Sequence, residues 1–232
     1  MTYCISDIHG CYDEFMALLE QIQFNPLSDT IYILGDVIDR GVKPIDSLRF
    51  IIETKSIHML MGNHEQLMLD YLDGKDRLTW LFNGYKNTLS QLKKLTRSER
   101  DKIISYLRSC PFYETITTNG KQYFLSHAGL DVSLPFSRQS HDALIWSRKG
   151  FYENKAMAEY ICIFGHTPTP NLHEDHHLCS VWYDTQYNDK ICIDCGCVYG
   201  GALSAICLDD GKIFYVKSNI TERGFRIHET TV

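Results

Sequence analysis

The stretch Ile31–Gly41, with the sequence IYILGDVIDRG, carries the strongest indication of how this chain folds. Its first four residues are apolar, as in a strand that is buried on both faces, and the glycine that follows lets the backbone turn sharply. Two aspartates and an arginine come directly after that glycine. Because open α/β sheets bind ligands at the carboxyl ends of their strands, the stretch predicts a buried strand that ends at a functional site.

Four further strand-like runs end in the same way. Polar segments follow them at Asp7–Gly10, Gly62–Glu65, His127–Gly129 and Gly165–Pro168. One such segment alone is usually an ordinary loop, but five at the strand ends of one sheet would converge, and buried polar groups need mutual neutralisation. Three histidines, two aspartates and one asparagine in these segments suit a divalent cation such as Mn, Fe or Zn.

The first third of the chain alternates between strands and helices. Apolar residues at helical spacing predict helices over about 12–22, 44–52 and 65–72, between strands at 3–5, 31–34 and 57–61. This alternation implies a parallel sheet with right-handed crossovers.

The rest of the chain has a different pattern. Two polar helical stretches, 77–94 and 98–109, predict a helical insertion at about 74–110, which we interpret as a cap or substrate-shaping element. The remainder is mostly strand-like and predicts a β-meander half. We therefore expect an α/β fold in which two sheets pack face to face with helices outside.

Composition and charge limit the class of protein. The chain has 232 residues, of which 44% are hydrophobic, and we expect one domain over 1–232. A net charge of -6 argues against broad binding to nucleic acid or to an anionic membrane. The sequence shows no apolar run of about 18 residues, as a membrane-spanning helix would need, and no export signal. The nine cysteines are typical of reduced, buried thiols. These features predict a cytoplasmic protein.

The polar segments together resemble a known set of motifs. Asp-x-His, Gly-Asp-x-x-Asp-Arg-Gly, Gly-Asn-His-Glu, His and Gly-His-Thr-Pro occur in the order and spacing of the calcineurin-like metallophosphoesterases. More narrowly, the set is similar to that of the PPP-type serine/threonine protein phosphatases of bacteria and phages, from Asp7 to about Leu203. The resemblance implies a four-layer α/β/β/α sandwich of two mixed sheets. It also implies two divalent metal ions, usually manganese, with iron or zinc as alternatives.

The resemblance also assigns metal ligands. Asp7 and His9 match the ligands of the first metal, and Asp36 matches the carboxylate that bridges both metals. The ligands of the second metal match Asn63, His127 and His166. Two such cations acidify a bridging water, and the resulting hydroxide attacks phosphorus directly, without a covalent phosphoenzyme.

Four residues match the family's catalytic groups. His64 matches the general acid, and Asp39 would orient it and raise its pKa by charge pairing. Arg40 and Arg148 match arginines that hold phosphate oxygens.

The substrate is less narrowly indicated. The main prediction is hydrolysis of phosphoserine or phosphothreonine esters, with phosphotyrosine as a further substrate, so the partner would be a phosphorylated protein or a small phosphoester. Met61 stands where related protein phosphatases carry arginine, and diadenosine tetraphosphate hydrolases have an apolar residue at this position. Asp39 and Glu65, in contrast, favour the phosphatases. Alternatives are therefore a bis(5'-nucleosyl)-tetraphosphatase, a cyclic-nucleotide phosphodiesterase, or an inactive binding module. The oligomeric state is not indicated.

Overall fold

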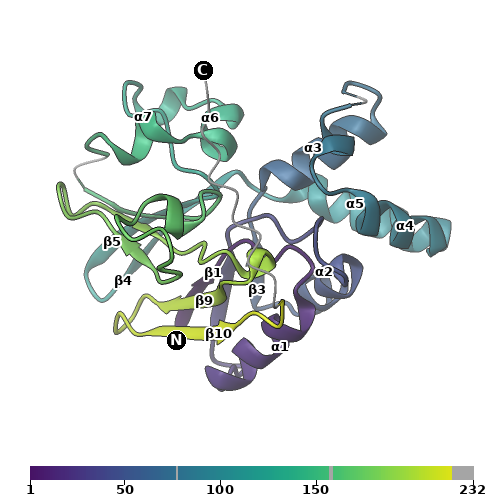
Figure 1. Cartoon of the computed structure of the whole chain (residues 1–232), viewed down its shortest axis with the longest axis horizontal. Helices are drawn as coiled ribbons and strands as arrows, with labels where there is room; N and C mark the ends of the chain where they lie inside the picture. Colours follow the sequence, from purple (N-terminus) through teal and green to yellow (C-terminus); the bar gives the residue numbers. More distant parts are fainter. Residues whose placement is uncertain (77, 157–158, 221–232) are drawn as a thin grey trace.

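Two five-stranded sheets form the centre of the computed structural model, which describes residues 1–76, 78–156 and 159–220 (Figure 1). The strand order is β10-β9-β1-β2-β3 in the first sheet and β4-β5-β6-β8-β7 in the second. The first sheet comprises β1 (Thr2–Ile5), β2 (Thr30–Ile33), β3 (Ile57–Met59), β9 (Ala202–Cys207) and β10 (Ile213–Lys217). The second comprises β4 (Tyr113–Thr118), β5 (Lys121–Ser126), β6 (Ile161–Phe164), β7 (Trp182–Tyr183) and β8 (Lys190–Cys192).

The parallel unit predicted for the first third of the chain is confirmed. β1, β2 and β3 run parallel, with Ile5 opposite Ile33 and Ile33 opposite Met59. Helices α1 (Tyr12–Gln21) and α2 (Pro44–Glu53) connect these strands, and α3 (Asn63–Leu72) follows β3. The carboxyl ends of the three strands therefore lie at one edge of the sheet.

The β-meander predicted for the second half is only partly correct: the antiparallel pairs β4–β5 and β9–β10 agree with it, but the centre of the second sheet does not. β5, β6 and β8 run parallel, with β4 and β7 antiparallel at the two edges of their sheet. Helices α6 (His141–Trp146) and α7 (Lys149–Tyr152) lie between β5 and β6, and β9 joins the first sheet beside β1. These helices are too short to give a clear periodic signal, so the sequence did not reveal the crossover between β5 and β6.

The core has three parts that define four layers. Leu34, Leu125 and Ile163 belong to a cluster between the two sheets. Phe15 and Leu48 of α1 and α2 pack on the outer face of the first sheet, and α6 and α7 contribute to a third cluster with β5 and β6. Each fully buried aliphatic side chain stabilises the fold by about 2 kcal/mol. The α/β/β/α sandwich expected from the resemblance is confirmed.

The insertion is helical but starts differently from the prediction. It contains a short 3-10 helix, η1 (Trp80–Phe82), followed by α4 (Lys86–Lys94) and α5 (Arg97–Ser109), and it extends to one side of the sheets (Figure 1). The predicted helix over 77–94 begins only at Lys86, because Gly84 has φ +89° and interrupts the helical backbone. Residue 77 lies outside the described residues. Thr96 caps α5 by accepting a hydrogen bond from the Glu99 N–H.

Two further expectations can be compared with the structure. Eight of the nine cysteines are buried, which agrees with their role as core residues. In residues 1–76, 78–156 and 159–220, no helix is long and apolar enough to cross a membrane.

Candidate metal centre and active site

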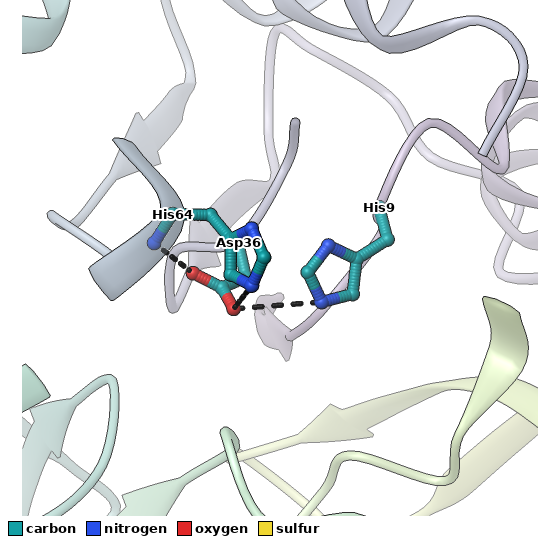
Figure 2. Close-up of side chains that lie close together, drawn as sticks. All are labelled: His9, Asp36 and His64. Carbon is teal, nitrogen blue, oxygen red and sulfur yellow. Dashed lines mark hydrogen bonds and ion pairs between the residues drawn. The ribbon is translucent and has the colours of Figure 1, made fainter. Parts of the chain in front are cut away.

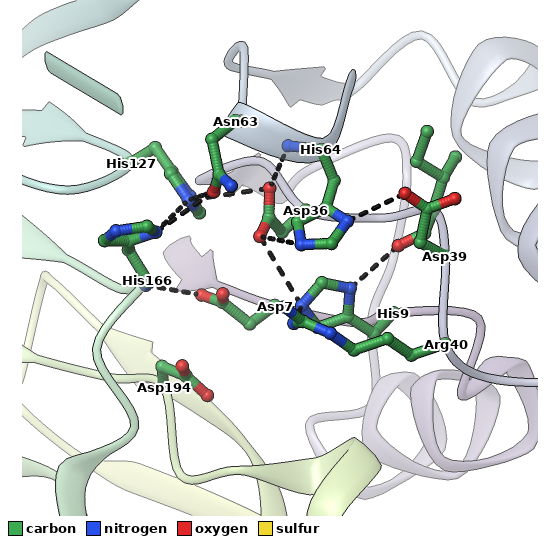
Figure 3. A network of polar contacts seen from close by, with 12 residues as sticks. Asp7, His9, Asp36, Asp39, Arg40, Asn63, His64, His127, His166 and Asp194 are labelled. Atoms are coloured by element: carbon green, nitrogen blue, oxygen red, sulfur yellow. Dashed lines mark hydrogen bonds and ion pairs between the residues drawn. The ribbon is translucent and has the colours of Figure 1, made fainter. Parts of the chain in front are cut away.

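The six predicted metal ligands meet where the two sheets face each other (Figure 3). Asp7 and His9 follow β1, Asp36 follows β2, and Asn63 begins α3. His127 and His166 follow β5 and β6, so two strands of the second sheet contribute as well as three of the first. The expectation that all five strand ends belong to one sheet is therefore wrong. Each of the six residues is at most 8% exposed.

Asp36 lies between two groups of potential ligands. Its Oδ2 is 3.4 Å from His9 Nε2, and its Oδ1 is 3.5 Å from His127 Nε2. Ligand atoms of His9, Asp36 and His64 lie within 4.8 Å of one another, and so do those of Asp36, His127 and His166. Figure 2 shows the first of these groups. A carboxylate shared by both groups is in the position that a bridging ligand requires.

The second group is tightly packed. Asn63 Oδ1 is 2.8 Å from His127 Nε2 and 3.0 Å from His166 Nδ1, and these two ring nitrogens are 3.1 Å apart. Asp7 reaches the same group, because its Oδ2 accepts a hydrogen bond from the backbone N–H of His166 at 3.0 Å. Neighbouring nitrogen and oxygen donors of this kind suit a divalent transition metal.

Backbone carbonyls orient two of the imidazoles. His9 Nδ1 lies 2.7 Å from the carbonyl oxygen of Ile38, and His127 Nδ1 lies 2.8 Å from that of Leu34. If each Nδ1 donates its proton, the lone pair of Nε2 faces the centre, as in histidines that bind metals. His64 Nε2 and His166 Nε2 are buried and have no hydrogen-bond partner among the residues that the structure describes. The residues present therefore fit a pair of divalent metal ions.

The electrostatics of the site lead to the same conclusion. Burial raises the pKa of Asp36 well above its usual value, and the neighbouring Glu65 adds to this effect. Burial also lowers the pKa of His127 to about 3 and the pKa values of His9 and His166 well below the usual value, so these rings are neutral. Neutral imidazoles next to carboxylates that are costly to ionise favour the binding of cations.

Backbone strain is concentrated at the site. Nine non-glycine residues in the described part of the chain have positive φ, and six of them belong to the site. These six are Asp7, His9, Asp36, Asp39, Arg40 and His166. A left-handed conformation costs a non-glycine residue on the order of 1–3 kcal/mol and persists only where surrounding contacts hold it. The fold thus maintains a constrained arrangement of these side chains.

Glu65 holds the loop that carries Asp36, a role that the sequence did not indicate. Its Oε2 accepts hydrogen bonds from the N–H groups of Asp36 and Gly62, at 2.8 and 3.2 Å. Its Oε1 accepts from those of Val37 and Ile38, at 2.9 and 3.1 Å. Burial raises the pKa of Glu65 to about 7. Its place three residues into α3, typical of a capping box, is the one signal in the sequence for this role.

The predicted acid and its partner are in contact. His64 Nδ1 lies 2.7 Å from Asp39 Oδ2, and both side chains are at most 1% exposed. His64 Nε2 is 3.9 Å from Asp36 Oδ2, so the ring reaches from Asp39 to the candidate metal ligands. Asp39 is expected to raise the pKa of His64, but the net direction is nevertheless downward, because burial, with help from the Arg40 charge, lowers the pKa of His64 well below its usual value. For Asp39 the same burial raises the pKa to about 6.

The two predicted arginines lie on different sides of the site. The guanidinium of Arg40 contacts His9 Nε2 and lies over the ring of Tyr199, with 5.4 Å between Cζ and the ring centroid. Arg148 donates a hydrogen bond to Thr167 Oγ1 at 3.3 Å, beside His166 in the chain. Both positive charges lower the pKa of His127, so both act on the same centre.

Asp194 is a site residue to which the sequence assigned no role. Its carboxylate lies next to Asp7 (Figure 3), is 5% exposed and accepts a hydrogen bond from the Gly196 N–H. After burial, its charge is the largest cause that raises the pKa of Asp7. It follows β8, which the predicted meander did not place at this edge.

The two-sheet fold and the two groups of candidate metal ligands are the features that place this protein in a class. The chain belongs to the calcineurin-like phosphoesterase family, whose sequence pattern matches residues 2–208. Members of this family hold a dinuclear centre of divalent metal ions.

Several relatives at the level of sequence are bis(5'-nucleosyl)-tetraphosphatases. The symmetrical bis(5'-nucleosyl)-tetraphosphatases of Salmonella paratyphi C and Salmonella typhimurium are 35% identical to this chain over 130 residues. Each match covers 56% of this chain and 43% of the relative, so the shared part is less than half of the curated enzymes.

Solved structures share the fold at lower identity. A protein serine/threonine phosphatase from Saccharomyces cerevisiae has a TM-score of 0.61 and 15% identity, over 95% of this chain and 80% of that one. A cold-active protein-tyrosine phosphatase from a Shewanella species has a TM-score of 0.59 and 19% identity, over 92% and 79% of the two chains. These likenesses support the architecture of two sheets flanked by helices.

Proposed function

We propose that this chain hydrolyses a phosphoanhydride bond of a dinucleoside polyphosphate, with symmetrical bis(5'-nucleosyl) tetraphosphates as the first substrate class. The observation that supports this proposal best is the 35% identity to enzymes of that name, over 130 residues. The sequence left two activities open, and this proposal prefers the tetraphosphatase, which Met61 favours, to the protein phosphatase. Since the match covers 43% of those enzymes, the substrate has to be established on this chain itself.

Met61 supports this preference. Its side chain is 2% exposed and belongs to the apolar cluster with α1 and α2, and its N–H donates to the carbonyl oxygen of Pro111 at 2.8 Å. This position offers no positive charge to a phosphomonoester, where related protein phosphatases have an arginine. A substrate that is held at several phosphates, and at its nucleosides, depends less on one phosphate clamp.

The proposed roles of the side chains follow from their positions. Asp7, His9, Asp36, Asn63, His127 and His166 would hold two divalent ions. Such ions polarise phosphoryl oxygens and acidify a water molecule for in-line attack. Arg40 and Arg148 would bind phosphoryl oxygens from two sides. His64, held by Asp39 at Nδ1, presents Nε2 to the leaving oxygen, and a bound phosphate would raise its pKa.

The products of diadenosine tetraphosphate test this proposal. Purified protein with Mn²⁺ is expected to convert each substrate molecule into two molecules of adenosine diphosphate, resolved by ion-exchange chromatography. In ¹⁸O-labelled water, one of the two products should carry a single ¹⁸O, because one water is consumed per bond. Release of a monophosphate and a triphosphate, or a kcat/KM below that for a phosphoserine peptide, would contradict the proposed substrate class.

One observation favours a second candidate, a phosphatase for phosphoserine or phosphothreonine. The Asp39–His64 pair, at 2.7 Å, provides a group that can protonate a leaving alkoxide, which is a strong base. A nucleoside diphosphate leaves as a stable anion and needs this help less. His64→Asn should therefore reduce kcat for a phosphoserine peptide by about 100-fold, but kcat for diadenosine tetraphosphate much less. Equal losses on both substrates would count against His64 as an acid.

A further inference from the structure

The turn that carries Asp39 and Arg40 is strained and needs external support. The two consecutive residues have φ +69° and +64°, a conformation that is unfavourable for side chains other than glycine. Such strain persists only where neighbouring groups fix the backbone. His9, His64 and Tyr199 contact this turn, and the first half of the insertion at 74–110 supplies several further groups that hold it.

Two side chains of the insertion bind the Asp39 carboxylate directly. Trp80 Nε1 donates to Asp39 Oδ2 at 2.8 Å, the oxygen that also contacts His64 Nδ1. The Thr88 hydroxyl donates to Asp39 Oδ1 at 2.7 Å and accepts from the Asp39 backbone N–H at 2.9 Å. Trp80, Thr88 and Asp39 are each 0% exposed. The carboxylate is thus fixed at both oxygens, and its orientation sets the plane of the His64 ring.

The neighbouring arginine is held by the same segment. The Arg40 N–H donates to the Gly84 carbonyl at 2.9 Å, and Asn87 Nδ2 donates to the carbonyl oxygens of Arg40 and Gly41 at 3.2 and 2.8 Å. A Cβ atom on Gly84 would lie 2.7 Å from Arg40 Cγ. Only glycine therefore permits this approach.

We propose that Trp80 and Thr88 are positioning residues for the Asp39–His64 pair, and that the insertion supports the catalytic turn from behind. This role adds to our interpretation of the insertion as a cap or substrate-shaping element. The proposal rests on the proposed function, because it assumes that His64 assists a leaving group. Packing alone would account for a buried tryptophan, but it would not require indole and hydroxyl donors at both oxygens of one carboxylate.

Kinetics on two phosphoesters test the proposal. Thr88→Val keeps the shape of the side chain and removes both hydrogen bonds, and Trp80→Phe removes the indole donor. We expect each change to lower kcat for phenyl phosphate about tenfold at unchanged KM, and kcat for p-nitrophenyl phosphate less than about twofold, because nitrophenolate needs little protonation. Thr88→Ser, which keeps the hydroxyl, should restore the wild-type ratio of the two rates.

The matched control is Thr96→Val, in the same insertion. It removes the cap of α5, which has no contact with Asp39, and should lower the thermal stability without changing the ratio of the two rates. Equal losses on both substrates in Thr88→Val and Trp80→Phe, or a changed ratio in Thr96→Val, would overturn the proposal.

A spectroscopic measurement separates this proposal from the proposed function. In full-length protein loaded with Zn²⁺ and labelled with ¹⁵N-histidine, the His64 Nδ1 proton should give a downfield signal that is absent in His64→Asn. Thr88→Val and Trp80→Phe should shift this signal, and Thr96→Val should leave it in place. If the wild type hydrolyses neither ester, the second candidate function fails, but the His64 signal still decides whether Trp80 and Thr88 position the pair. An unchanged His64 Nδ1 proton signal in both Thr88→Val and Trp80→Phe would refute the positioning role.

Discussion

At the scale of single residues, the site is organised by side chains that do not belong to the predicted ligand set. Glu65 holds four backbone N–H groups on two segments, and Ser6 contacts the carboxylate of Asp7. The motifs in the sequence indicated which atoms could bind metal, because ligand types and spacings are specific. They placed the Asp194-Cys195-Gly196 segment near the metals but gave Asp194 no role of its own, because only the strand order brings its carboxylate beside Asp7.

Glu65→Gln tests the importance of this backbone support. The amide nitrogen of glutamine would face two N–H donors that now bind a carboxylate oxygen, and we expect the free energy of unfolding to fall by about 3 kcal/mol. The affinity for Mn²⁺ should fall about tenfold or more, because Asp36 loses its support. Urea unfolding and metal titration would measure the two effects. Glu20→Gln, on the exposed face of α1, is the control, and equal behaviour of the two variants would contradict the role of Glu65.

At the scale of elements, the first half of the fold could be predicted and the second could not. Long amphipathic helices such as α1 and α2 alternate with apolar strands, and their order alone specifies a parallel sheet. β7 has two residues and β8 three, and β6 pairs with β8 instead of with β7, the next strand in sequence. Their pairing depends on tertiary packing, which strand propensity does not encode.

Lys190 on β8 illustrates such packing. Its side chain is 0% exposed, and Nζ binds Asp184 at 2.9 Å, Asp189, and the carbonyl oxygen of Asn154 at 2.8 Å. These contacts join β8 to the segment after α7, and Arg148 directly precedes α7.

Lys190→Met should therefore destabilise the protein. The change would leave two aspartates without their buried cation, and we expect a loss of about 3–5 kcal/mol in the free energy of unfolding. Calorimetry would measure it. Lys212→Met, which removes an exposed ion pair with Asp210, should have little effect. Similar transitions for both variants would contradict the importance of the buried cluster.

At the scale of the whole molecule, the site joins the two sheets. Asp7, Asp36 and Asn63 come from the first sheet and its helices, and His127 and His166 come from the second. Metal ions bound to both sets would link the two halves of the sandwich, so binding and folding should be coupled.

Removal of metal should accordingly lower the melting temperature. At a free Mn²⁺ concentration of 100 times the dissociation constant, binding to the folded state contributes about 2.7 kcal/mol, which corresponds to several degrees for a chain of this size. Thermal unfolding with excess Mn²⁺, and after treatment with a chelator, would show the difference, with KCl of equal ionic strength as the control. Identical melting temperatures would show that the ligands from the two sheets do not share metal.

We propose that Asp36 joins two metal ions into one centre, and metal content measured together with turnover tests this claim. Wild-type protein and Asp36→Asn are saturated with Mn²⁺ and passed through gel filtration. The bound metal per chain is then measured together with kcat/KM for diadenosine tetraphosphate. We expect two Mn²⁺ per wild-type chain, and in Asp36→Asn the loss of at least one ion and a decrease in kcat/KM of about 100-fold or more. Asp210→Asn, outside the site, should behave as the wild type. Two tightly bound Mn²⁺ and undiminished turnover in Asp36→Asn would contradict the claim.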